Sequence, residues 1–248
     1  WREFLALPGI ATSLWLTAWT GVAATGLSLL VAAGLAAGWG RWFGPAAGAR
    51  LLAPLLAAPH AALAIGLAFL LAPSGWIARA LAPLMGWDRP PMAATVNDPA
   101  GVALIVGLIV KEVPFLLLVI LSALSQIPVR RHLAAGRSLG YARGIVWIKV
   151  IMPQVWPLIR LPVMVVLAYS LSVVDMALIL GPSNPPTLAV LLLRLFSAPD
   201  VGILLTASAG ALVQGGLVLI AFALLLMLER AGRVIGRWWV RRGGRGLS

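Results

Sequence analysis

Five long apolar runs, separated by polar connections, constrain the fold of this 248-residue chain more than any other feature. An α-helix rises 1.5 Å per residue, so about 20 apolar residues are enough to cross a bilayer. Each run is long enough to do so. The expected spanning helices cover about residues 10–37, 51–72, 100–124, 158–180 and 201–228.

The composition supports a membrane protein. The chain is 61% hydrophobic and only 10% charged, whereas soluble domains have about 45–50% apolar and about 25% charged residues. We therefore expect an all-α, polytopic transmembrane helix bundle that forms a single domain over residues 1–248. The net charge is +12, and the basic residues are confined to a few loops. This distribution suits contact with anionic lipid headgroups and orientation in the membrane, and it argues against a nucleic-acid partner.

The distribution of the basic residues predicts which side of the membrane each connection faces. The loop with Arg41 and Arg50, the central segment 125–157 and the tail 229–248 fall on one side of the five spans and hold most of the 19 Lys and Arg residues. Because basic loops stay in the cytoplasm, the C-terminus is expected there and the N-terminus of this chain in the periplasm. Residues 188–196 are too short to span and are expected to form a short periplasmic interfacial helix.

The central segment is the longest polar and basic stretch within the apolar chain. Read as a helix, it places small residues among arginines and ends at Gly140, a residue type that readily takes the left-handed conformation at a helix C-terminus. A short exposed helix of this kind suits docking into a groove of another protein. A basic loop that only contacts lipid headgroups is the alternative, and the residue types alone do not separate the two.

The same residues resemble the coupling motif of binding-protein-dependent ABC importer permeases, which reads Glu-Ala-Ala, three variable residues, Gly, and an apolar residue before Pro about a dozen residues later. Here Ala134-Ala135-Gly136, Gly140 and Met152-Pro153 fall at that spacing. Ala134 stands where Glu is usual, and Gly136 where the second Ala is usual. The resemblance implies that a cytoplasmic coupling helix contacts the ATPase, with Arg130, Arg131, Ala134, Ala135, Gly136, Arg137, Ser138, Leu139, Gly140 and Pro153 as the coupling residues.

Further stretches extend the resemblance to most of the chain. Residues 111–115, 153–162 and 172–175 are similar to the second half of the fused double-length permeases of the thiamine and ferric-iron group. The resemblance implies a type I permease of the bacterial inner membrane. It also implies three kinds of partner besides the lipid bilayer: cytosolic ABC ATPase subunits, a second permease half or subunit, and a periplasmic substrate-binding protein. Thiamine, a ferric ion, another small cation and a small organic solute all remain open as substrates.

The chain carries no phosphate-binding loop of the Gly-x-x-x-x-Gly-Lys-Ser/Thr type, and its only lysines are Lys111 and Lys149. ATP is therefore expected to bind to another subunit, and the chain is not expected to be an enzyme. It has no cysteine and only two histidines. We accordingly predict no catalytic residues, no metal site and no cofactor.

Charged side chains near the middle of a bilayer cost at least about 2.5–3.5 kcal/mol each on insertion scales, so they usually face a cavity or a partner. The candidates for a translocation path or gate are Lys111, Glu112, Pro114, Asp175 and His60. Glu112 or Lys111 would pair with Asp175 if these residues served helix packing instead, and the sequence favours this structural role slightly. A subunit of a secondary transporter or channel is the competing function, although no inverted repeat is evident.

Overall fold

The computed structural model describes residues 1–42, 45–89 and 95–241, and within these ranges the chain is helical with no β-strand. The helices are α1 (Arg2–Leu5), α2 (Ile10–Trp42), α3 (Pro45–Ala57), α4 (His60–Leu71), α5 (Trp76–Met85), α6 (Val102–Ser125), α7 (Val129–Ser138), α8 (Arg143–Val146), the π-helix η1 (Trp147–Ile151), α9 (Met152–Ser172), α10 (Asp175–Leu180), α11 (Leu188–Phe196) and α12 (Ile203–Arg241). The expected all-α polytopic bundle is confirmed.

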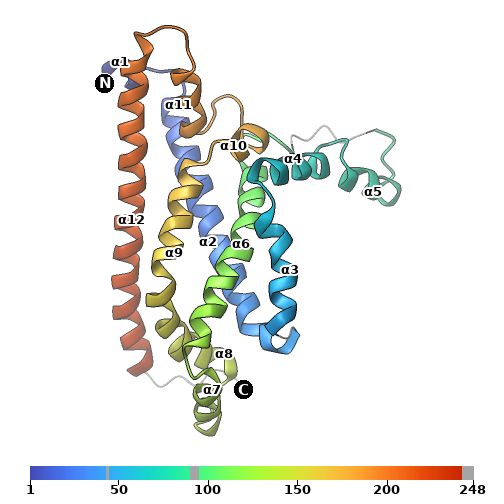
Figure 1. The fold of residues 1–248 in the computed structure, drawn as a ribbon, viewed down its shortest axis with the longest axis vertical. Coiled ribbons are helices and arrows are strands. Elements are labelled where there is room, and N and C mark those ends of the chain that lie inside the picture. Colours follow the sequence, from blue (N-terminus) through green and yellow to red (C-terminus); the bar gives the residue numbers. More distant parts are fainter. Residues whose placement is uncertain (43–44, 90–94, 242–248) are drawn as a thin grey trace.

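Among the residues that the structure describes, five segments are long and apolar enough to cross a membrane: 10–38, 60–85, 102–125, 143–172 and 203–236. Helices α2, α6 and α9 pack side by side as the centre of the bundle, and α12 lies along its edge next to α9 and α11 (Figure 1). Helices α7 and α8 lie at one end, together with the C-terminal ends of α2 and α12. The N-terminus, α4, α10 and α11 lie at the opposite end (Figure 1).

The apolar core consists of layers along the bundle. Leu116, Ile120, Val155 and Ile159 join α6 to α9 near the end that carries α7. At the other end, one cluster packs α10 against α4 and α6, and a second joins α1, α2, α11 and α12. The many exposed apolar side chains outside these clusters are what a lipid-facing surface requires.

Close helix contacts occur at different glycines from those that the sequence indicates. The spacing of Gly34 and Gly38 predicts a close contact between small residues, but a Cβ atom at Gly34 would meet nothing within 4 Å. Instead, a Cβ atom at Gly107 would lie 2.5 Å from Leu180 Cδ1, and one at Gly21 would lie 2.6 Å from Leu171 Cδ2. These two glycines allow α10 to approach α6 and α9 to approach α2.

Four features of the segments differ from the predicted ones. The run 51–72 is divided into α3 and α4 at Ala58–Pro59, and the run 158–180 is interrupted at Val173–Val174. α9 begins at Met152 and contains Pro157 and Pro162, although these prolines favour a later start. The expected tail from residue 229 continues α12 as helix to Arg241, while residues 242–248 of that tail lie outside the described ranges.

Candidate functional site

Helix α7 is a short helix with a well-defined end. The backbone N–H of Tyr141 donates to the Gly136 carbonyl at 2.9 Å, and the N–H of Gly140 donates to the Arg137 carbonyl at 3.0 Å. Gly140 has φ +78°, so these two bonds form a Schellman motif that satisfies carbonyls of the last helical turn. The prediction that Gly140 ends this helix is confirmed.

The two faces of α7 differ in exposure. Gly136 is buried, and a Cβ atom there would lie 2.2 Å from Cγ2 of Val146 in α8. Gly136 therefore provides the space in which α7 and α8 cross. The remaining predicted coupling residues of the helix are exposed, namely Arg130, Arg131, Ala134, Ala135, Arg137 and Ser138, and so are Leu139 and Gly140 just after it. The helix presents this basic, small-residue face at the end of the bundle (Figure 1).

Pro153 occupies a different place from the other residues of the motif. It is exposed in the first turn of α9, directly after the π-helical turn η1, within a helical segment that runs from Arg143 to Ser172. It lines a groove between α9 and the C-terminal part of α12. The motif therefore contains an exposed helix face, an internal packing position at Gly136, and an exposed proline just after the junction of η1 and α9.

Lys111 is buried in α6 and reaches across to α3. Its ammonium group donates to the carbonyls of Leu55, Leu56 and Ala58 at 3.1, 3.1 and 2.5 Å. These carbonyls lie where α3 ends before Pro59, and the last carbonyls of a helix have no partner within the helix. Lys111 thus caps α3 and stabilises the break between α3 and α4.

Glu112 points to the other side of α6, into a buried polar cluster with α2 and α9. The hydroxyl of Ser170 donates to Glu112 Oε1, and Thr25 Oγ1 donates to Ser170 Oγ at 3.2 Å. Glu112 Oε2 and the hydroxyl of Ser28 are also buried, and the Ser28 side chain interacts with Glu112. The cluster lies at the contact of the three central helices.

Asp175 lies at the break in the fourth predicted span. It begins α10 directly after Val173 and Val174, and its Oδ1 accepts a hydrogen bond from the Met176 N–H at 2.9 Å. The His60 ring lies 4.9 Å from the Tyr169 ring, at an angle of 43°, and His60 interacts electrostatically with both Asp175 and Lys111. The structure therefore brings together His60, Tyr169 and Asp175, all of which are half-buried.

The ion pairs weighed from the sequence do not form. Lys111 bonds to carbonyls and Glu112 to a serine, so neither residue forms the pair with Asp175 that the sequence suggests. Pro114 is buried inside α6, where its ring leaves the Val110 carbonyl without the usual donor. Within the described ranges, no three His, Asp or Glu side chains come together as a metal site would require.

Sequence reasoning missed Thr25, Ser28, Tyr169 and Ser170. Isolated Ser and Thr residues in apolar helices carry a weak signal, because their hydroxyls can bond to the carbonyl one turn earlier instead. The available signal was that the first and the fourth predicted spans each carry two hydroxyl residues close together, Thr25 with Ser28 and Tyr169 with Ser170. Only the packing of α2, α6 and α9 reveals that the hydroxyls of Thr25 and Ser170 gather at the Glu112 carboxylate.

Comparison with known proteins adds one sequence match. No protein-family model matches the chain. Over 173 residues, the chain is 34% identical to the inner membrane ABC transporter permease protein YnjC of Escherichia coli (strain K12). The match covers 70% of this chain and 32% of that protein, so the chain corresponds to about a third of the relative's length. This similarity confirms the resemblance of the chain to ABC transporter permeases.

Proposed function

We propose that the chain is a transmembrane permease subunit, or half-subunit, of an ATP-driven ABC importer in the bacterial inner membrane. Helix α7 carries this proposal, because it places a basic face of small residues at the end of a bundle whose segments are long enough to span a membrane. The match to an inner membrane ABC transporter permease supports the same function.

Docking of a cytosolic ATPase is assigned to the exposed face of α7. Ala134 and Ala135 leave room for the walls of a cleft, and Arg130, Arg131 and Arg137 surround them with positive charge. Gly136 transmits the motion, because its contact with Val146 ties α7 to α8 and so to the start of the fourth span. ATP-driven closure of the ATPase would then bias a two-state helix bundle.

The part of the translocation path that contacts the solute is assigned to the end of the bundle opposite α7. Lys111 and Glu112 already have structural partners within the fold, so Asp175 and His60 are the better candidates for a surface that a solute contacts. A second membrane domain would complete the path, and the greater length of the matched relative supports such an arrangement. A periplasmic binding protein would select the small solute.

The energy source separates this proposal from a secondary transporter. The permease complex, isolated with the ATPase that copurifies with it, is reconstituted into vesicles with the binding protein and radiolabelled solute. Uptake is expected to require ATP on the side that carries α7 and to persist when an ionophore abolishes the proton gradient. Uptake that follows the gradient and ignores ATP depletion would contradict an ABC importer.

The docking assignment has its own test. Ala135→Trp adds bulk to the exposed face of α7, so it is expected to abolish stimulation of the ATPase while membrane insertion is retained. Ala80→Trp is the matched control, because Ala80 is an exposed helical alanine on α5, far from α7 (Figure 1). If Ala135→Trp stimulated the ATPase as strongly as Ala80→Trp does, the ATPase would dock elsewhere.

A further inference from the structure

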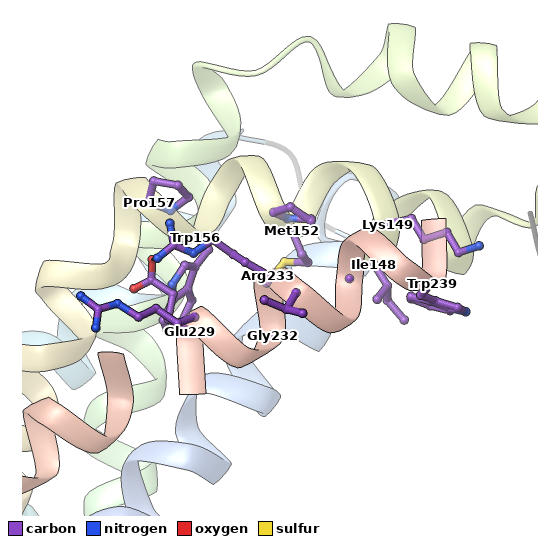
Figure 2. A pocket seen from close by; sticks show the side chains of 13 residues that line it. Ile148, Lys149, Met152, Trp156, Pro157, Glu229, Gly232, Arg233 and Trp239 are labelled. Atoms are coloured by element: carbon purple, nitrogen blue, oxygen red, sulfur yellow. The ribbon is translucent and has the colours of Figure 1, made fainter. Parts of the chain in front are cut away.

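A groove with a volume of about 1110 Å³ lies between the start of the fourth span and the C-terminal part of α12. Helices η1 and α9 form one wall and α12 the other, and the lining includes Lys149, Met152, Trp156, Arg230, Arg233 and Trp239 (Figure 2). The groove takes no part in the contact between α7 and α8. Its occupant is therefore a separate question from the docking of the ATPase.

The charge of the groove favours an anionic ligand. Among the described residues that line it, Glu229 is the only one with a carboxylate, which pairs with Arg160 at 3.8 Å and with Arg233 at 3.6 Å. Arg230 is a further exposed cation on the same wall. The ion pairs of Glu229 are long, so both guanidinium groups keep donors for a phosphate, which arginine binds well.

The groove also holds buried polar atoms without partners. Trp156 Nε1 and Glu229 Oε2 are buried and make no hydrogen bond to the described residues. The Glu229 side chain as a whole is only 7% exposed. An indole N–H can only donate. A buried donor without an acceptor costs free energy, so Trp156 would gain from an acceptor oxygen in the groove.

The remaining lining is apolar, and its level along α12 identifies the source of the ligand. Ile148, Met152, Pro157 and Val234 provide an apolar surface, while Trp156 and Trp239 are the residue type that gathers at the headgroup level of membranes. The groove begins at Glu229, directly after the long apolar run of α12 ends at Leu228. A ligand there would enter from the lipid layer.

We propose that this groove binds an anionic phospholipid, with its phosphate beside Arg230 and Arg233 and an acyl chain against the apolar wall. Basic pockets between transmembrane helices on the cytoplasmic side are known to suit such headgroups. The proposal does not depend on ABC transport, because it requires only that the basic end of α12 lies at the membrane surface.

Native mass spectrometry of the full chain, delipidated in mild detergent, tests the proposal. The probes are phosphatidylglycerol, phosphatidylcholine with the same acyl chains, and inorganic phosphate. Phosphatidylglycerol is expected to bind about tenfold or more tightly than phosphatidylcholine, since each arginine near an anionic lipid contributes about fivefold. Equal binding of the two lipids would overturn the proposal, and displacement by low millimolar phosphate would show that a free anion is the ligand.

Variants locate the binding. Arg230→Gln/Arg233→Gln is expected to lower the affinity for phosphatidylglycerol about tenfold or more, whereas Arg2→Gln/Arg79→Gln makes the same change of charge at the opposite end and is expected to leave it unchanged. Equal affinities of the two double variants would refute the site. If the first variant does not fold, Trp156→Phe replaces it, and an unchanged affinity of that variant would refute the site as well.

Discussion

Gly136 shows how one missing side chain can connect two helices. A Cβ atom at residue 136 would lie 2.2 Å from Val146 Cγ2, which is closer than real Cβ atoms approach other atoms. The position therefore needs glycine for space, although alanine has the higher helix propensity. The coupling motif contains this position, and the sequence suggested docking for it. In the structure Gly136 is buried against Val146, and its part in coupling to the ATPase stays a prediction.

Gly136→Ala is expected to push α7 away from α8, to lower the free energy of unfolding by about 1–3 kcal/mol, and to reduce stimulation of the ATPase. Adding Val146→Ala should restore both. Gly144→Ala in α8 is the matched control, because a Cβ atom there meets nothing within 4 Å. Thermal unfolding and ATPase assays measure the outcome. A stable, fully coupled Gly136→Ala variant would contradict the close contact.

Lys111→Met removes the charged donor that caps α3. Hydrogen bonds from charged groups contribute about 1.5–3 kcal/mol, and the carbonyls left behind would be unsatisfied, so the variant is expected to lose about 3 kcal/mol of stability. Arg2→Met, on an exposed residue of α1, is the control. A variant of normal stability that transports a different range of solutes would instead place Lys111 in the translocation path.

At the scale of single residues, the sequence predicts which side chains need a partner but not which partner they find. Lys111 and Glu112 are neighbours on a helix, so they point about 100° apart and cannot face each other. Their charge made them visible as candidates. Their partners, carbonyls for one and Ser170 for the other, carry no charge signal and are set by packing alone.

At the scale of elements, short helices were easier to predict than breaks. The sequence predicted a short helix at 188–196, where α11 lies, because turn residues bound it on both sides. The break at Val173–Val174 has neither Gly nor Pro, so the apolar run appeared continuous. Pro157 and Pro162 gave the opposite error, since both lie inside α9. In a membrane, neighbouring helices can satisfy the backbone groups that such prolines free.

The break before α10 makes Asp175 the sharpest test of the translocation path. Asp175→Asn keeps a side-chain oxygen at the start of α10 and so is expected to leave the fold intact. Removing the charge should lower uptake about tenfold, which corresponds to a loss of about 1.4 kcal/mol. Asp88→Asn, on an exposed residue after α5, is the control in the same uptake assay. Normal uptake with unchanged solute selectivity would exclude contact with the solute.

At the scale of the molecule, the hydrophobic pattern was sufficient for the fold class and for the grouping of the loops at the two ends of the bundle. Helix α7 and the C-terminal ends of α2 and α12 lie at the same end of the bundle, as the basic loops indicate (Figure 1). Which end faces the cytoplasm rests on the distribution of Lys and Arg alone. That inference is independent of the fold and needs its own experiment.

The absence of cysteine in the sequence allows a direct measurement of orientation. Ser138→Cys on α7 and Ser74→Cys between α4 and α5 are both exposed positions at opposite ends of the bundle. A membrane-impermeant maleimide is expected to label Ser138→Cys almost completely in inverted vesicles and hardly at all in right-side-out vesicles. Ser74→Cys is expected to be labelled in right-side-out vesicles and hardly at all in inverted ones. The unaltered chain controls for background. The opposite pattern would invert the assigned topology.

Helix α12 is continuous from Ile203 to Arg241, and this has a consequence for the bilayer that can host the protein. At 1.5 Å per residue, its apolar part up to Leu228 measures ~39 Å, whereas the hydrocarbon layer is about 30 Å thick. A tilt of the helix relative to the bilayer normal would accommodate this difference, and the tilt can change with the thickness of the bilayer. Because α12 lies at the edge of the bundle, thicker membranes would reduce its tilt without disturbing the contact of α2, α6 and α9.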